Sequence, residues 1–395
     1  SRTDPGNLNQ RRVPTALERN GGFSQTFDSQ GRLIFIRNPS IIGGTCNAQT
    51  GAGNACFPGN VIPAGQIDAT AQRLLNLFPL PNAVDPTGTN QYNYTFQTVQ
   101  DWPRNDQVLR MDYNIAQNTT MYGRLQFGYE KRAGGVSFLG ASGGWPQMST
   151  KYEIDTVSYV NTLLHTFNQN TFAEFTIGVN WAHQYTTPFD QAALDSNDRS
   201  KVLPGFPQFF PNANPLNLLP QATFQGGLPN PNGNYASFGY EQRFGFFGYN
   251  TPSNVSGNIT KIAGAHNMKA GLFVEHTTRP AQRSSAFNGT VSFNTDGSNP
   301  GNTNIGFANA LVGAITQYQE SNGHPRAHGE FYNTEFYVQD NWKLKRNFTI
   351  DAGLRFYYIT PTSSSGDKVS VFNPEQWSAS AAPLLYVPVS TPQGR

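Results

Sequence analysis

The sequence predicts an all-β protein whose main element is an antiparallel, membrane-spanning β-barrel. Between Tyr332 and Tyr358, apolar and polar residues alternate with a period of two along two strands that are separated by Lys345, Arg346 and Asn347. Each strand holds this pattern for about a dozen residues, whereas a strand of a globular protein usually runs about 5 to 6. A barrel strand that crosses a bilayer needs about 9 to 11 residues. The length and period of this hairpin therefore favour a transmembrane barrel.

The same pattern predicts three further hairpins. Their paired strands are Gln107–Ile115 with Met121–Tyr129, Tyr152–Phe167 with Thr171–Tyr185, and Val255–Ile262 with Met268–Thr277. We expect one more strand within Tyr235–Tyr249, and either a strand or a short helix with a strand within Ile305–Tyr318. The total of about nine or ten strands fits a closed barrel of that size or part of a larger one.

Long irregular segments separate these hairpins, at residues 131–150, 186–254 and 278–331 and after residue 359. Connections of this length are uncommon in a compact soluble domain. Regular alternation of short turns with long loops is instead typical of outer-membrane barrels, which have short periplasmic turns and long extracellular loops.

Two regions are therefore expected. Residues 1–104 are predicted to be a loop-rich extracellular region, and residues 105–395 the front part of the barrel with its long extracellular loops. Within the first region, Ile67–Phe78 predicts a short helix that Asp68 or Thr70 could cap. The apolar residues of this helix fall on one face: Ala71, Leu74, Leu75 and Phe78.

Composition limits the class of protein. The 27 Lys and Arg residues nearly balance the 25 Asp and Glu residues. The net charge of +2 therefore argues against the clustered basic excess that nucleic-acid binding needs. The 39 Gly, 27 Pro, 13% aromatic and 13% charged residues, with a mean hydropathy of -0.49, fit a barrel with a wet lumen and polar loops. No apolar run reaches the roughly 18 residues of a transmembrane helix. The polar start lacks a signal peptide, so we expect a processed or internal segment of a longer protein.

Cys46 and Cys56 flank a stretch rich in Gly, Asn and Ala. A small loop disulfide in an oxidising compartment is one interpretation, and two free thiols are the other. A metal site is disfavoured, because no second Cys pair or nearby His completes four ligands.

Charged residues on the polar strand faces are predicted to face the barrel lumen. They are Arg110, Asp112, Arg124, Glu174, Glu335, Lys343, Asp351 and Arg355. Ion pairs and hydrogen bonds between strands are one role for them, and a ligand site is the other. We expect Leu354 and Phe356 to face lipid. Aromatic residues near strand ends are expected to form interfacial girdles: Tyr129, Trp181, Tyr185, Trp342, Phe356 and Tyr358.

The loop Leu203–Leu219 carries Phe206, Phe209 and Phe210 among prolines that stiffen it. Exposed aromatic rings there could stack on sugars or hold a peptide, so these three residues are candidate ligand contacts. Packing against neighbouring loops is the alternative.

Motifs for catalysis and metal binding are weak. Residues 140–144 match G-x-S-x-G, but Trp145 and Pro146 follow at once and prevent the helix of a nucleophile elbow. His324 and His328 are separated by Pro325, which prevents a helix that would place both on one face. His266 is expected to support a hairpin turn. The sequence predicts no enzyme, and no catalytic, cofactor or metal site.

The segment FYVQDNWKLKRNFTIDAGLRFYY resembles a signature of TonB-dependent outer-membrane receptors. Its matching residues are Gln339, Asp340, Trp342, Lys343, Asn347, Thr349, Gly353, Leu354 and Arg355. Other segments resemble the Oar-like branch, large receptors of acidobacteria and their relatives with a carboxypeptidase-regulatory-like domain. They are VPTALERNGGFSQTFDSQGRLI from Val13, Phe57–Asn82, Asn309–Gly313, and the hairpin with Gly264, His266, Lys269 and Gly271.

The resemblance implies a 22-stranded barrel in the outer membrane of a Gram-negative bacterium. It also implies a plug domain that TonB moves together with ExbB and ExbD, and import of an extracellular ligand such as a saccharide, peptide or chelate. No plug, TonB box or terminal strand with a final aromatic residue is recognisable, so we expect the first extracellular region and the front half of the barrel. An adhesive or structural extracellular β protein and a passive porin are the alternatives.

Overall fold

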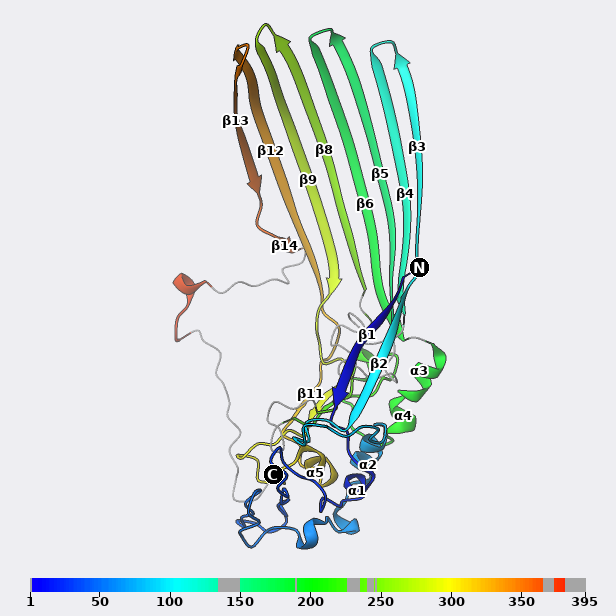
Figure 1. Ribbon diagram of the computed structural model, residues 1–395, viewed down its shortest axis with the longest axis vertical. Coiled ribbons are helices and arrows are strands. Elements are labelled where there is room, and N and C mark those ends of the chain that lie inside the picture. The colour runs from blue at the N-terminus through cyan, green and yellow to red at the C-terminus, as the bar shows by residue number, and fades with distance from the viewer. Residues whose placement is uncertain are drawn as a thin grey trace.

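The computed structural model describes residues 2–133, 150–188, 190–225, 235–239, 245, 247–364 and 373–380. A tall sheet of long strands rises from a globular layer of short helices, short strands and connecting segments (Figure 1). Within these residues, no helix has the length and hydropathy required to span a membrane.

The tall sheet contains eleven strands among the described residues, and all its pairs are antiparallel. They are β1 (Arg2–Arg11), β2 (Tyr94–Trp102), β3 (Arg104–Ala116), β4 (Thr119–Ala133), β5 (Thr150–Asn168), β6 (Thr171–Pro188), β8 (Phe247–Ala263), β9 (His266–Gln282), β12 (Arg326–Lys345), β13 (Phe348–Ile359) and β14 (Ser363–Ser364). The order is β1-β2-β4-β5-β6-β8-β9-β12-β13, with β3 paired to β4 and β14 paired to β12. Between β3 and β13 the described sheet stays open.

All four predicted hairpins are confirmed, with strands of up to 20 residues. Two-residue turns at 117–118, 169–170, 264–265 and 346–347 join β3 to β4, β5 to β6, β8 to β9 and β12 to β13. These turns lie together at the end of the sheet remote from the globular layer (Figure 1). The long connections therefore gather at the opposite end, as the alternation of short and long segments predicts.

Strand pairing sorts the side chains into two faces, because directly paired residues point to the same side. One face is mostly apolar and is here called the apolar face. In one of its rows Val274 pairs with both Val255 and Thr334, and in another Val338 pairs with both Ala270 and Leu354. Its apolar members include Leu109, Met111, Leu125, Phe127, Tyr159, Phe175, Ile177, Val179, Val255, Ile259, Leu272, Val274, Phe336, Val338, Leu354 and Phe356. The other side, here called the polar face, carries most of the charged strand residues.

Polar residues border the apolar face at equal intervals on different strands. On β12 the borders are Glu330 and Asp340, and on β5 they are Asp155 and His165, so both intervals are ten residues (340 − 330 and 165 − 155). Ten residues at about 3.3 Å each, tilted by about 40°, cover roughly 25 Å across a bilayer. This height matches the apolar band of about 25 Å of an outer-membrane barrel.

Three details of the strands differ from the sequence prediction. Strands β1 and β2 lie in the region expected to be loops, and β2 continues into β3 with only Pro103 between them. Of the strand predicted within residues 235–249, residues 240–244 and 246 lie outside the described part; Tyr235 and Phe238 make isolated bridges to Arg12 and Ala222, and residues 247–249 begin β8. Residues 305–318 form the expected helix with a strand, but this strand belongs to the globular layer instead of the tall sheet.

The globular layer is built from short elements of several connections. Its helices are α1 (Ala16–Arg19), α2 (Ala69–Asn76), α3 (Gln191–Ser196), α4 (Arg199–Val202) and α5 (Gly306–Leu311), with 3-10 turns η1 (Pro58–Asn60), η2 (Ala64–Gln66) and η4 (Pro211–Ala213). A small sheet has the order β11-β10-β7 (Gln317–Gln319, Thr290–Ser292 and Gln221–Thr223). The 3-10 turn η5 (Pro374–Gln376) lies apart, beyond β14.

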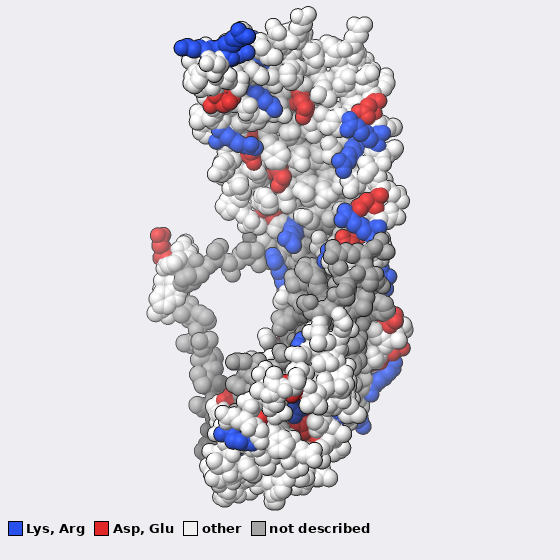
Figure 2. Space-filling model, viewed as in Figure 1, with Lys and Arg blue, Asp and Glu red and all other residues white. Residues whose placement is uncertain are grey.

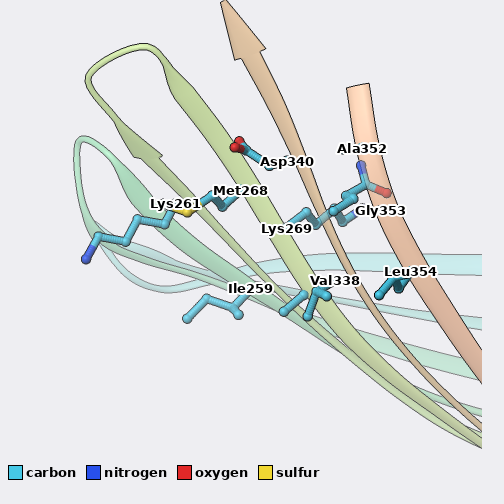
Figure 3. Close-up of a pocket in the computed structure, with 11 residues that line it drawn as sticks. Ile259, Lys261, Met268, Lys269, Val338, Asp340, Ala352, Gly353 and Leu354 are labelled. Atoms are coloured by element: carbon cyan, nitrogen blue, oxygen red, sulfur yellow. The ribbon is translucent and has the colours of Figure 1, made fainter. Parts of the chain in front are cut away.

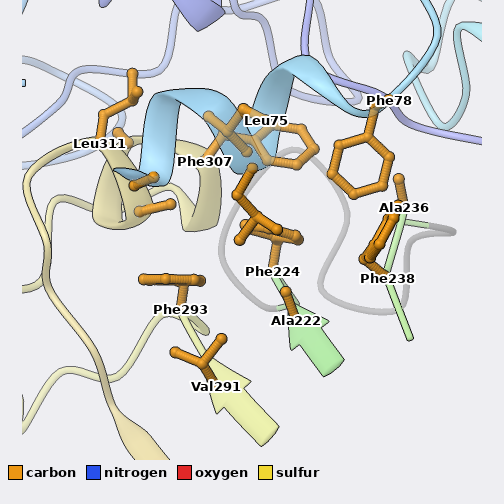
Figure 4. Packing of buried hydrophobic residues seen from close by; sticks show 14 of the residues in the cluster. Leu75, Phe78, Ala222, Phe224, Ala236, Phe238, Val291, Phe293, Phe307 and Leu311 are labelled. Carbon is orange, nitrogen blue, oxygen red and sulfur yellow. The ribbon is translucent and has the colours of Figure 1, made fainter. Parts of the chain in front are cut away.

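The connections share one hydrophobic core, which lies in the globular layer (Figure 4). Phe224 is fully buried between Phe293, stacked at 5.5 Å between ring centroids, and Phe307 at 5.3 Å. The predicted helix is confirmed as α2, with Asp68 as its N-cap, and it buries Ala71, Leu74 and Leu75 in this core together with Phe78. The long segments that the sequence presents as separate loops thus fold into one body.

One disulfide and one buried ion pair stabilise this layer. Cys46 and Cys56 form a disulfide with a Cα–Cα distance of 4.9 Å. The buried Arg12 donates from Nη1 to Glu18 Oε2 at 3.1 Å, and this carboxylate also accepts from the Thr15 amide and the Thr26 hydroxyl. Burial opposes ionisation, but these partners hold the pKa of Glu18 below its ordinary value. A buried charge pair with all partners in place ties β1 to the layer.

Candidate ligand-binding site

A pocket of about 480 Å³ opens in the globular layer. Apolar and aromatic side chains form most of its wall, and Asp68 is the charged residue among those that line it. The lining residues are Asp68, Thr70, Ala71, Leu74, Leu203, Gly205, Phe206, Pro207, Phe209, Phe293, Gly313, Ile315 and Tyr318. This volume and lining are typical of sites for small organic ligands.

Helix α2 supplies one wall of the pocket. The Asp68 carboxylate accepts from the Ala71 amide at 2.8 Å, while the Asp68 amide donates to the Leu311 carbonyl at 2.7 Å. Asp68 therefore starts the helix and joins it to the end of α5. Since this cap orients Ala71 and Leu74, the wall is set by the same residues that the sequence predicted for the helix.

The opposite wall is the loop after α4, which Glu320 holds in place. Its two carboxylate oxygens accept from the amides of Phe209 and Phe210 at 2.9 and 2.8 Å. The hydroxyl of Tyr318 donates to the same carboxylate at 2.6 Å. Three hydrogen bonds to one charged group fix the backbone of this loop, because charge-assisted bonds are stronger than neutral ones.

These contacts change the acidity of both side chains. Burial, followed by the hydrogen bond to Glu320, raises the pKa of Tyr318 to about 12. Burial alone would raise the pKa of Glu320, but the amides of Phe209 and Phe210 and the Tyr318 hydroxyl hold it below its ordinary value. At neutral pH the loop is therefore held by an ionised carboxylate and a protonated phenol.

The structure brings two of the three candidate loop aromatics into this pocket. The ring of Phe206 lies 6.3 Å from that of Tyr318 and 5.1 Å from the Arg199 guanidinium, and the ring of Phe209 lies 6.0 Å from that of Tyr318. Phe210 does not line the pocket but is 42% exposed, and Phe209 is 68% exposed. Phe206 thus packs against its neighbours, while Phe209 keeps an exposed ring at the mouth.

The sequence did not predict a binding role for the pocket residues Ile315 and Tyr318, or for Glu320, which holds the loop of Phe209. They come from the segment before β12, more than 100 residues from Phe209. The sequence predicted a strand, or a short helix with a strand, within Ile305–Tyr318, and no local motif there marks a binding role.

The predicted lumen residues all fall on the polar face. Strand register places seven of them there, namely Arg110, Asp112, Arg124, Glu174, Glu335, Asp351 and Arg355, and Lys343 follows by alternation. Arg110 pairs with Asp112 at 2.7 Å, and Arg124 donates to Gln126 at 2.6 Å. Positive and negative side chains lie close together over the visible side of the sheet (Figure 2). That this face lines a lumen stays a prediction.

Aromatic residues lie near both borders of the apolar face. Trp342 stacks on His266 at 5.2 Å near the turns, and Trp181 lies 5.6 Å from Tyr249 near the globular layer. Phe356 differs from the expectation, because it stacks on Phe336 at 5.0 Å, midway between the borders. The reason is that β13 ends at Ile359, whereas β12 continues toward the layer.

The remaining motifs acquire no site. Residues 140–144 lie outside the described part of the chain. His324 lies just before β12, and its ring is 4.3 Å from that of Phe287. His328 lies within β12. His266 opens β9, and its Nδ1 hydrogen-bonds Asp340 Oδ2 at 2.6 Å.

Comparison with known proteins identifies the family of this chain. No curated protein matches the sequence. The outer membrane transporter YddB from Escherichia coli aligns with a TM-score of 0.37 and 12% identity, over 72% of this chain and 31% of the transporter. The chain thus spans about a third of that transporter's length. The outer membrane β-barrel domain family matches residues 1–394, so the chain belongs to this family of outer-membrane proteins.

Proposed function

We propose that this chain is the front part of a TonB-dependent transporter of the Oar-like branch, of an acidobacterial type, and that it has no enzymatic role. Family membership and the receptor signature around Asp340 and Trp342 support this proposal. In this arrangement the apolar face contacts outer-membrane lipid and the polar face lines the lumen. The short turns are periplasmic, and the globular layer is extracellular.

The pocket beside Phe209 is the observation that favours a ligand-handling protein. Its aromatic loop is held in place before a ligand arrives, so little conformational entropy is lost on binding. The wall is mostly apolar; Asp68 and the nearby Glu320 are negative, and the Arg199 guanidinium lies 5.1 Å from the ring of Phe206. Among saccharides, peptides and chelates, a peptide with an apolar side chain fits this chemistry best.

Transport would then proceed in two stages. The extracellular layer binds the ligand, and the ligand passes along the lumen when TonB, with ExbB and ExbD, moves a plug supplied by the whole protein. The charged residues of the polar face, such as Arg110 and Glu335, keep the path hydrated. They also offer exchangeable hydrogen-bond partners to a passing peptide backbone.

Uptake by cells that express the whole natural protein tests this function. A mixture of Leu- and Phe-containing tripeptides and maltooligosaccharides is added, and its loss from the medium is measured by mass spectrometry. We expect the tripeptides to be depleted, and depletion to stop when TonB is removed. Depletion that persists without TonB would identify a porin, and the absence of depletion would leave the adhesive alternative.

Two variants connect uptake to the pocket. Ile315→Trp fills the pocket and should abolish depletion, and Phe209→Ala removes the ring at its mouth and should reduce it. Phe210→Ala is the matched control, since Phe210 is a neighbouring exposed aromatic that does not line the pocket. Equal effects of Phe209→Ala and Phe210→Ala would argue against this pocket as the ligand site.

A further inference from the structure

The apolar face has a hollow of about 760 Å³ near the turns (Figure 3). Two adjacent rows of paired residues across β8, β9, β12 and β13 form most of its lining, together with Lys269, Gln339 and Gly353. The deeper row is Ile259, Ala270, Val338 and Leu354, and the row nearer the turns is Lys261, Met268, Asp340 and Ala352. The hollow exists because Ala270 and Ala352 are small, whereas their neighbours on this face are large.

The edge of the hollow nearer the turns carries two opposite charges. Lys261 and Asp340 both pair with Met268, from the strands on either side of β9. The Lys261 side chain extends away from β8, and in the described part of the chain it has no ion-pair or hydrogen-bond partner (Figure 3). A cation thus stands at the border of the apolar band, and none of the described residues provides a counter-ion for it.

Only one of the two carboxylate oxygens of Asp340 has a hydrogen-bond partner among the described residues. Its Oδ2 bonds to His266 Nδ1 at 2.6 Å, but its Oδ1 is buried and finds no hydrogen-bond partner among the described residues. A buried acceptor without a partner costs free energy, so such an atom indicates a missing donor. The hollow therefore combines an apolar floor with an unpaired cation and an unpaired acceptor at one edge.

We propose that this hollow is a binding site for one phospholipid whose headgroup carries both a phosphate and a primary ammonium group. The acyl chains lie over Ile259, Ala270, Val338 and Leu354. The phosphate contacts the Lys261 ammonium, and the headgroup ammonium donates to the Asp340 carboxylate, whose side chain is 31% exposed. The site rests on the lipid-facing orientation of the apolar face that is part of the proposed function.

The charge pattern distinguishes this lipid from other occupants. An anionic lipid without an amine would satisfy Lys261 and leave Asp340 Oδ1 unpaired. A choline headgroup has no N–H donor for that oxygen. A zwitterionic headgroup with an ammonium group matches both charges, across a gap that the flexible lysine side chain can adjust.

Native mass spectrometry of the whole natural protein tests the site. The protein is purified from outer membranes, delipidated and titrated with phosphatidylethanolamine, phosphatidylglycerol or phosphatidylcholine. We expect one retained phosphatidylethanolamine, and about tenfold weaker retention of each of the other two, since one charge-assisted contact is lost in each case.

Matched variants separate the contributions. Lys261→Gln should weaken retention about tenfold. Lys343→Gln should not change it, because Lys343 lies on the polar face and does not line the hollow. Ala270→Leu fills the hollow without changing charge and should abolish retention. Heat-modifiable migration in detergent confirms that each variant is folded.

Several results would overturn the proposal. They are equal retention of the three lipids, unchanged retention in both Lys261→Gln and Ala270→Leu, or a protein dimer or a partner protein at this face in place of lipid. A failure of the underlying orientation is seen separately, because a cysteine at Leu354 would then react with a water-soluble thiol reagent even though the protein is folded.

Discussion

Glu335 and Arg355 join β12 to β13 on the polar face, where the Arg355 Nε donates to Glu335 Oε2 at 2.8 Å. The residue before this arginine, Leu354, points to the other face and lies opposite Val338. Two consecutive residues therefore report on the two environments of the sheet, and their side chains provide the most direct test of its orientation.

Cysteine labelling distinguishes the two faces. In the folded protein, Arg355→Cys should react with a charged, water-soluble thiosulfonate, and Leu354→Cys should not, because the proposed orientation covers it with lipid. The two cysteines of this chain are joined in a disulfide, so they add no free thiol to the background reaction. Faster reaction at residue 354 than at residue 355 would reverse the assignment of the faces.

A charge in the middle of the apolar band should destabilise the barrel. Phe336 lies opposite Phe356, midway between Glu330 and Asp340, so Phe336→Arg should cost about 2–4 kcal/mol. Tyr357→Arg is the matched control, since Tyr357 is an exposed aromatic on the polar face and should tolerate the charge. Urea unfolding of the whole protein in lipid vesicles measures both. Similar costs for the two variants would mean that the faces do not differ in polarity.

Acid should loosen the loop that carries Phe209. The pKa of folded Glu320 lies below its ordinary value of 4.5, so its stabilising effect is complete above that value and is lost as the pH falls through the folded pKa. Hydrogen exchange of the Phe209 and Phe210 amides, corrected for the intrinsic pH dependence, should therefore accelerate below about pH 4.5.

Glu320→Gln should produce that acceleration already at pH 7, because it replaces the charged acceptor with a weaker neutral one. Asp296→Asn is the control, since the carboxylate of Asp296 accepts from Ser298 in a different loop. Protection of both amides that is unchanged by Glu320→Gln would show that this carboxylate does not hold the loop.

Removing the disulfide should weaken the globular layer and leave the tall sheet intact. The bond closes a loop with a sequence separation of 10, so replacing Cys46 and Cys56 by alanine should cost about 2.5–3 kcal/mol in a chain-entropy model. We expect faster hydrogen exchange around Ile36 and Phe57, which lie beside this loop. Heat-modifiable migration of the barrel should stay as in the unmodified protein, and a loss of it would mean that sheet and layer unfold together.

The sequence predicted the parts of the fold that carry a local signal. The four hairpins follow from period-two alternation and short polar turns, and helix α2 follows from its cap and its apolar spacing. Strand β1 gave no such signal, because RTDPGNLNQR lacks alternation and contains Pro5 and Gly6. Its pairing with β2 depends on residues more than 80 positions away.

The candidate pocket was predicted only in part for the same reason. Phe206 and Phe209 are noticeable as aromatics in a stiff loop, but Tyr318, Glu320 and Asp68 acquire their roles only when distant connections meet. The core residues Phe224 and Phe293 likewise lie in segments without helical or strand periodicity. Single-sequence patterns report the elements that order themselves locally, and this layer is ordered by tertiary contacts.

The shared core also sets an order of assembly. Its residues come from connections before β2, between β6 and β8, and between β9 and β12, so strands that have to cross the membrane separate them along the chain. Each hairpin can form from neighbouring residues, whereas the core needs contacts of very high sequence separation, which form slowly. We therefore expect the layer to close only after the hairpins have inserted and paired. An incompletely assembled barrel would then lack the pocket, so a misassembled copy in the membrane would not compete for ligand.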